Sequence, residues 1–235
     1  MQAADKILRE MRRLGSPANV EGMARFGIVS PKAFGIPTPA IRAMARRLGR
    51  DQTLAEQLWA TGVYDVRVLA SLVADPAAIS RSTMDKWTRD FDNWAVCDSC
   101  CCNLFDRTPF VWHKIPKWAA SQREFVRRAA FATLAGAAVH DRTADDEHFL
   151  DGLALIEKYA FDDRNFVRKA VNWALRNIGK RNAALLPAAM ACAERVREQG
   201  TRASRWIAAD ALREFRLKYG SASVRADDVA SEQRG

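Results

Sequence analysis

A motif that returns after about 40 residues constrains this chain more than any other feature. The stretch REFVRRAAFATLAG at 123–136 aligns with RNFVRKAVNWALRNIG at 164–179 after a shift of 41 residues. RASRWIAADALREF at 202–215 follows after a further shift of 37, and YDVRVLASLVA at 64–74 is a weaker copy. A unit of this length holds two helices and cannot bury its apolar face alone, so successive units must stack.

The rest of the sequence agrees with a helical fold. Period-two alternation and hairpin dipeptides are nearly absent, whereas helical periodicity recurs along the chain. We therefore predict an all-α superhelix of HEAT-like repeats, with one domain over 1–219 and a polar, disordered tail over 220–235. Helices are predicted within IPTPAIRAMARRLG at 36–49 and at 53–61, 64–74, 82–89, 93–105, 110–120, 123–138, 146–160, 164–179, 183–198 and 202–218.

Composition excludes some classes of protein. No apolar run among the 235 residues approaches the roughly 20 needed to cross a bilayer. The first residues, MQAADKILREMRRLG, lack the apolar centre of a secretory signal. We expect a cytoplasmic, nucleoid-associated monomer that contacts no membrane. The formal net charge of +9 favours a polyanionic partner, of which nucleic acid is the commonest in a cell.

The repeated motif carries basic residues at corresponding positions. These are Arg127, Arg128, Arg168, Lys169 and Arg205. Corresponding faces of successive helices line one wall of a solenoid, so we expect several of these cations to form a row along a phosphate backbone. The alternative is that they are ordinary solvated helix faces.

Four of the five cysteines crowd into DNWAVCDSCCC at 92–102. This spacing suits neither a disulfide framework nor a zinc site, because the three histidines form no ligand pair with the thiols. We expect no metal and no cofactor, and interpret the thiols as small packing residues.

Two tryptophans are further candidates for functional residues: Trp94, within the cysteine-rich stretch, and Trp173, in a later repeat. Trp94 and Asp98 lie one helical turn apart and share a face. Trp173 stands where the preceding repeat has Ala132. Each Trp could equally fill the core, and Asp98 could equally cap or solvate its helix.

Taken together, these stretches resemble the AlkD-like DNA alkylation repair glycosylases, which are HEAT-like solenoids that excise alkylated purines. The resemblance extends over most of residues 20–219, with the first third weakest. The matching stretches are MARFGI (23–28), FGIPTPAIR (34–42), DNWAVCD (92–98), IPKWAAS (115–121), FVRRAAF (125–131) and FVRKAVNWALR (166–176).

The resemblance implies catalytic roles for Asp98, Trp94, Trp173 and Arg128. Asp98 would stabilise an oxocarbenium-like sugar and orient water, while the two indoles pack on the deoxyribose and backbone. Arg128 would hold a flanking phosphate and keep the carboxylate ionised. It further implies action on double-stranded DNA with alkylated purines.

The sequence also departs from the family. Phe26, which we expect to contact DNA, replaces a Tyr, and Asn93 stands where a second Trp occurs. The leading hypothesis is a monofunctional glycosylase for cationic N3- or N7-alkylpurines in duplex DNA. The alternatives are a non-catalytic protein that binds distorted or branched DNA, and a protein-binding scaffold.

Overall fold

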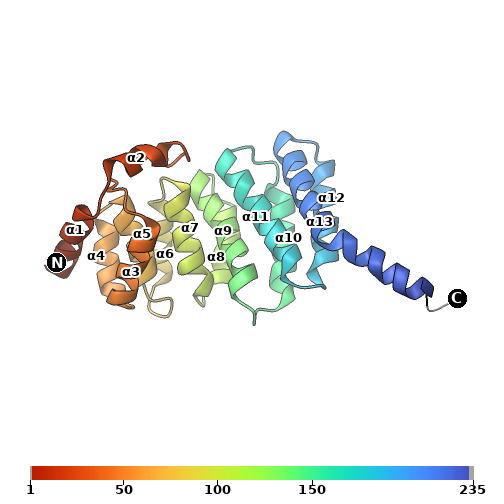
Figure 1. The fold of residues 1–235 in the computed structure, drawn as a ribbon, viewed down its shortest axis with the longest axis horizontal. Coiled ribbons are helices and arrows are strands. Elements are labelled where there is room, and N and C mark those ends of the chain that lie inside the picture. The colour runs from red at the N-terminus through yellow and green to blue at the C-terminus, as the bar shows by residue number, and fades with distance from the viewer. Residues whose placement is uncertain (1, 233–235) are drawn as a thin grey trace. The chain divides into compact units, whose positions relative to one another are not determined.

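The computed structural model describes the backbone of residues 2–232 and the side chains of residues 3–218. Over that range the chain is all-helical, with thirteen α-helices and no strand, as the periodicity predicted (Figure 1). No helix among these residues has the length and apolar character needed to cross a bilayer.

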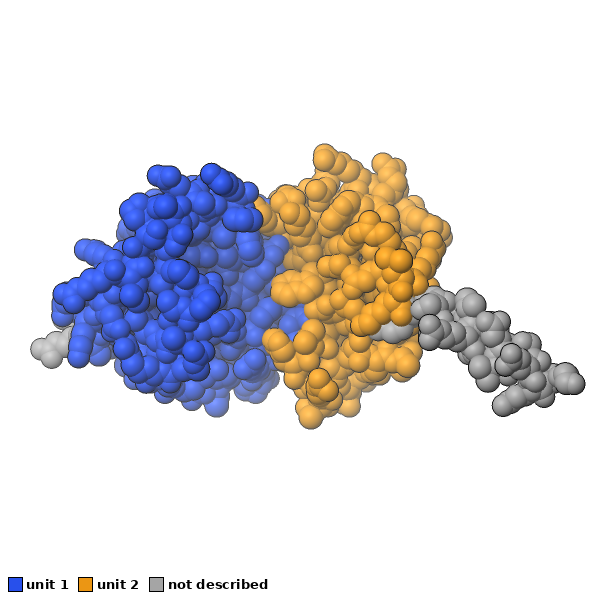
Figure 2. Space-filling model, viewed as in Figure 1, with its two compact units in different colours: residues 1–137 blue, residues 138–235 orange. Residues whose placement is uncertain are grey.

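The chain divides into two compact units, Met1–Ala137 and Ala138–Gly235 (Figure 2). A single domain over 1–219 stays a prediction, because compactness alone does not decide whether two parts fold together. The last helix continues through 232, into the segment for which we predicted disorder. Residues 233–235, the end of that predicted tail, lie outside the described residues.

The first unit holds the helices up to α9. They are α1 (Gln2–Arg13), α2 (Pro17–Ala24), α3 (Thr38–Leu48), α4 (Gln52–Ala60), α5 (Tyr64–Val73), α6 (Arg81–Arg89), α7 (Trp94–Asn103), the 3-10 turn η1 (Phe105–Arg107), α8 (Val111–Ala119) and most of α9 (Glu124–His140). The sequence did not predict α1 and α2. Helix α2 buries no residue, so it lacks the apolar stripe by which a helix is recognised.

The second unit holds the remaining helices. They are α10 (Asp146–Tyr159), α11 (Asn165–Arg181), α12 (Leu185–Glu198) and α13 (Arg202–Glu232). Helix α11 packs against both α12 and α13. The buried side chains of Leu175 and Phe215 lie in this core. The starts of α9, α11 and α13 therefore follow the repeat read from the sequence.

Short polar side chains set where several helices begin. Ser16, Asp51, Ser80 and Asn93 each accept a hydrogen bond from the backbone amide three residues later. Such a cap satisfies one of the amides that has no partner within the helix. The start of α7, which carries Trp94 and Asp98, is fixed in this way.

A buried carboxylate holds the loop between α2 and α3. Asp65 on α5 accepts hydrogen bonds from the backbone amides of Phe34, Gly35 and Ile36, at 2.6, 3.3 and 2.8 Å. Gly35 has φ +75°, a conformation that favours glycine, and its carbonyl accepts a bond from Asn19 of α2 at 2.9 Å. The loop therefore anchors α2 to α5.

Candidate active site

Helix α7 presents Trp94 and Asp98 one turn apart. The Asn93 side chain accepts from the Val96 amide at 3.0 Å, which starts the helix at Trp94. Trp94 is half-buried, and its indole N–H donates to the backbone carbonyl of Phe26 at 2.9 Å. The loop after α2 and the first turn of α7 are thereby joined.

Asp98 forms a two-pronged ion pair with Arg128 of α9. Arg128 Nε lies 2.9 Å from Asp98 Oδ1, and Nη2 lies 2.7 Å from Oδ2. The side chain of Arg128 is only 7% exposed, whereas that of Asp98 is 19% exposed. The Arg128 guanidinium carbon also lies 6.0 Å from the centroid of the Trp94 ring. Two facing helices thus bring an indole, a carboxylate and a guanidinium together.

The electrostatics of this pair reflect two opposed effects. Burial raises the pKa of Asp98, because a charged carboxylate loses hydration, while the charge and hydrogen bonds of Arg128 act in the opposite direction. The net direction is upward. Both carboxylate oxygens still accept from Arg128, which is the bonding pattern of an ionised carboxylate.

Three of the four thiols of α7 lie close to backbone carbonyls of α9. The sulfurs of Cys97 and Cys101 lie 3.6 and 3.5 Å from the carbonyl oxygens of Phe125 and Ala129. Both thiols are fully buried, and burial raises the pKa of each above the usual thiol value. The burial of Cys97, Cys100 and Cys101 agrees with the interpretation of these thiols as packing residues, whereas Cys102 is only partly buried. Among the described residues, no group of three His, Cys, Asp or Glu side chains could hold a metal ion.

The loop after α2 is exposed close to this cluster. Phe26 is 72% exposed and Val29 is 73% exposed. Only the Phe26 carbonyl takes part in the bond to Trp94, so the aromatic ring is left at the surface. An exposed aromatic ring on the loop that accepts the indole hydrogen bond is available to a ligand.

Four of the predicted residues lie in the second unit. Trp173 is half-buried on α11. Arg168 stacks over the Trp206 ring, with its guanidinium carbon 5.0 Å from the ring centroid. Lys169 is exposed. Arg205 is exposed too, and it donates to the Gly200 carbonyl at 2.7 Å.

One predicted contact residue needs correction. Arg127 is only 4% exposed, and its Nε donates to the carbonyl of Ala119 at the end of α8, at 2.9 Å. An arginine side chain that reaches the C-terminus of a neighbouring helix satisfies a carbonyl that has no partner within that helix. Arg127 is therefore a structural residue and does not belong to a DNA-binding row.

Arg128 is also placed differently from its expected phosphate-side role. Its guanidinium is bound to Asp98 and is nearly as buried as Arg127. It is suited to hold the carboxylate in place. A direct contact with a flanking phosphate stays a prediction.

Sequence reasoning missed a basic pocket in the second unit. Its cations come from Arg142, Lys180, Arg181 and Lys218. The only local signal was the Lys-Arg pair at the end of a predicted helix. The other two cations are distant in sequence, so their approach depends on tertiary structure.

The comparisons with known proteins agree with the all-helical fold. The sequence model of the family described as "DNA alkylation repair enzyme" matches residues 7–215. A solved structure is similar with a TM-score of 0.73 and 22% identity, over 81% of this chain and 82% of that one. It is described as representing a new family of proteins related to the HEAT-like repeat DNA glycosylases with affinity for branched DNA structures. No curated protein matches the chain. The family match covers most of the chain, which therefore belongs to the DNA alkylation repair enzyme family.

Proposed function

We propose that this protein is a monofunctional DNA glycosylase, which hydrolyses the N-glycosidic bond of cationic N3- or N7-alkylated purines in duplex DNA. The observation that carries the proposal is the cluster of Trp94, Asp98 and Arg128, in which a partly exposed carboxylate lies beside an indole. As a DNA repair enzyme it would act as a cytoplasmic, nucleoid-associated monomer.

The chemistry suits a site without a general acid. Alkylation gives the purine a positive charge, so the base leaves as a neutral molecule when the bond to C1′ breaks. The electron pair of that bond goes to the purine, and positive charge develops on the sugar. A fixed carboxylate stabilises this charge in the transition state.

Asp98 has oxygen lone pairs left for this task. The two bonds from Arg128 occupy one acceptor site on each carboxylate oxygen, and an ionised carboxylate offers about four such sites. A remaining site can accept a proton of the attacking water, whose oxygen then bonds to C1′. Trp94, and Trp173 on its own helix, would supply aromatic faces for the cationic substrate.

The decisive experiment replaces Asp98 with Asn. Asp98→Asn should abolish the release of 7-methylguanine from methylated duplex DNA and leave duplex affinity nearly unchanged, because only the charge on the reacting side is lost. Asp5→Asn, at an exposed position of α1, is the matched control and should keep wild-type activity. Release at the wild-type rate by Asp98→Asn would rule out the mechanism.

Loss of folding must be separated from loss of chemistry. Asp98→Asn removes a carboxylate charge that pairs with the buried Arg128 guanidinium, which is itself destabilising. Asp98→Glu keeps the charge and displaces it by one methylene group. We expect this variant to unfold at a temperature close to that of the wild type and to have a much lower kcat.

A second candidate function is non-catalytic binding of distorted or branched DNA. It is favoured by the likeness to the structure described as having affinity for branched DNA. A protein with this function would bind a four-way junction more tightly than a linear duplex of the same length. It would release no base from any alkylated substrate.

A further inference from the structure

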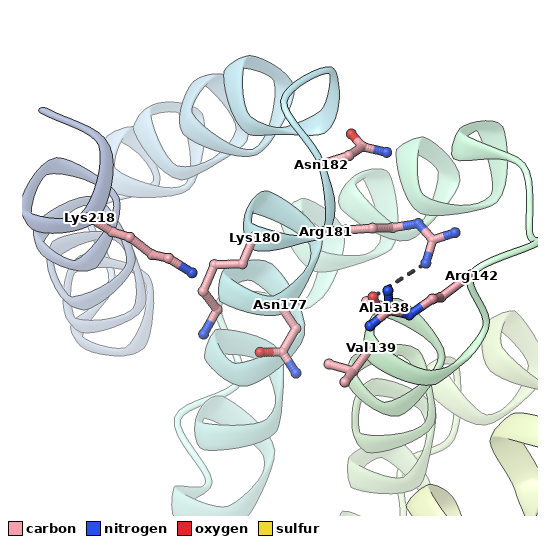
Figure 3. A pocket seen from close by; sticks show the side chains of 8 residues that line it. All are labelled: Ala138, Val139, Arg142, Asn177, Lys180, Arg181, Asn182 and Lys218. Atoms are coloured by element: carbon pink, nitrogen blue, oxygen red, sulfur yellow. Dashed lines mark hydrogen bonds between the residues drawn. The ribbon is translucent and has the colours of Figure 1, made fainter. Parts of the chain in front are cut away.

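The second unit contains an open pocket that the proposed chemistry does not use. Its volume is about 590 Å³, and every lining residue belongs to this unit. Figure 3 shows the side chains that surround it, from the end of α9, the end of α11 and α13. They are Ala138, Val139, Arg142, Asn177, Lys180, Arg181, Asn182 and Lys218.

The lining is strongly basic. Four of its eight residues are cationic and none is acidic. Lys180 forms an ion pair with Glu214 at 2.6 Å, but the same carboxylate also serves Arg176 at 2.5 Å. Arg176 also lies 3.6 Å from Asp210, which pairs with Arg213, so two carboxylates are shared among three cations. Arg142 is exposed and makes no ion pair with any residue that the structure describes.

A rigid frame holds these cations. Arg181 donates to the carbonyls of Asp141 and Ala144, at 2.6 and 2.9 Å, and packs over the Phe149 ring. This arginine therefore fixes the turn that carries Arg142 and is not itself the binding group. The Asp141 side chain accepts from the Thr143 and Ala144 amides at 3.1 and 3.0 Å, which tightens the same turn.

The pocket continues the face of α11 that carries Trp173. Lys180 follows Trp173 by seven residues, so the two side chains leave the helix in nearly the same direction. Seven residues correspond to a rise of roughly 10 Å along the axis. An extended polyanion that reaches the indole of Trp173 along this face would therefore meet the cations of the pocket.

We propose that this pocket binds a phosphodiester group of the DNA backbone. The proposal rests on DNA being the ligand in the proposed function, and it adds a phosphate site at Arg142, Lys180 and Lys218. Arginine and lysine side chains donate hydrogen bonds to phosphate oxygens, and each such contact releases counterions from the DNA. The site is independent of sequence, because every nucleotide offers the same group.

The first test measures the salt dependence of binding to unmodified linear duplex. Arg142→Gln and Lys180→Gln should each weaken binding at low salt and make the plot of log affinity against log salt shallower by about one. Lys158→Gln removes the same charge from an exposed position of α10 that is not part of the pocket, and should leave the slope unchanged. Unfolding temperatures close to that of the wild type would show that the variants fold.

The second test locates the ligand directly. Acylation of lysine amines, followed by mass spectrometry, should show that duplex DNA protects Lys180 and Lys218 but not Lys158. Equal protection by inorganic phosphate at the same phosphate concentration would assign the pocket to a free phosphate and overturn the proposal. Absence of protection by either ligand would overturn it as well.

The outcomes separate this inference from the proposed function. If the wild type binds duplex but the pocket variants behave as Lys158→Gln does, only the pocket assignment fails. If Asp98→Asn keeps full activity while the pocket variants weaken binding, only the proposed catalytic mechanism fails. A wild-type protein that binds no DNA would overturn both.

Discussion

Arg127 and Arg128 are adjacent in sequence and reach quite different partners. Arg127 extends to the end of α8, where it donates to the Ala119 carbonyl, whereas Arg128 extends to Asp98 of α7. Both guanidinium groups are buried. These two basic residues therefore stabilise a helix end and orient an acid, and they are not simply a charged surface.

We predict that Arg127→Gln lowers stability without affecting DNA binding. Loss of a charge-assisted hydrogen bond to a buried carbonyl should cost about 1.5–3 kcal/mol, measured as the free energy of unfolding in urea. Lys169→Gln is the matched comparison, because Lys169 aligns with Arg128 in the repeat and is exposed. It should unfold like the wild type and bind duplex more weakly. The reverse pattern would contradict the structural assignment of Arg127.

The Trp94–Asp98 pairing could be predicted from the sequence, but the partner of Asp98 could not. A spacing of four residues fixes a shared helix face by local geometry alone. Arg128 is 30 residues further along the chain, and which helix it faces depends on how α7 and α9 pack. The burial of Arg127 was unpredictable for the same reason.

At the scale of helices, the space around Gly179 shows how closely α11 and α13 pack. A Cβ atom added at Gly179 would lie 2.5 Å from two ring carbons of Phe215 and 3.0 Å from the Cβ of Ala189. The ring is fully buried and is closed in by the core of the second unit. The absence of a side chain at Gly179 thus permits the helix contact.

Gly179→Ala should therefore destabilise the protein by about 1–3 kcal/mol, as over-packed cores do. Helix propensity alone predicts the opposite effect, an increase of about 1 kcal/mol in the free energy of unfolding, because alanine favours a helix more than glycine does. Gly22→Ala on α2 is the control, because an added Cβ there meets nothing within 4 Å. It should raise the unfolding temperature, while Gly179→Ala lowers it. A stabilised Gly179→Ala would show that the helices are less tightly packed than described.

Helices α6 and α8 are joined by a carboxylate. Asp85 accepts hydrogen bonds from Lys117 at 2.8 Å and Trp118 Nε1 at 3.0 Å, and its oxygen lies 2.9 Å from the buried Lys114. Burial alone would raise the pKa of Asp85, but these bonds outweigh it and lower the pKa from 3.8 to about 2. The ionised form is therefore favoured by folding.

This shift predicts a pH dependence of stability. A depressed folded pKa contributes stability above the unfolded value, and the contribution is lost as pH falls from about 4 to about 2. Asp85→Asn should lower the free energy of unfolding by about 2 kcal/mol at pH 7 and by much less at pH 2. Urea unfolding at both pH values measures this difference. Asp151→Asn, at an exposed position of α10, should show no such difference. An equal cost at both pH values would contradict the assignment.

At the scale of the whole molecule, the repeat predicted the fold class and most helix positions, because periodicity reports burial along each helix. It did not predict α2, which buries nothing, nor the pocket, whose cations come from the turn after α9, the end of α11 and the middle of α13. The charge of +9 was informative only in part, since arginines such as Arg50 and Arg123 are bound to carbonyls at helix ends. Total charge cannot distinguish these arginines from cations at the surface.

The bond between α7 and the loop after α2 has a consequence for adaptation. The acceptor for the Trp94 indole is a main-chain oxygen, which every amino acid supplies equally. The orientation of the indole therefore does not depend on which side chain residue 26 carries. A phenylalanine in place of a tyrosine at position 26 removes a hydroxyl group but keeps the hydrogen bond to Trp94. The exposed side chain at position 26 can therefore be varied, in evolution or by mutagenesis, while the indole keeps its hydrogen bond and its orientation.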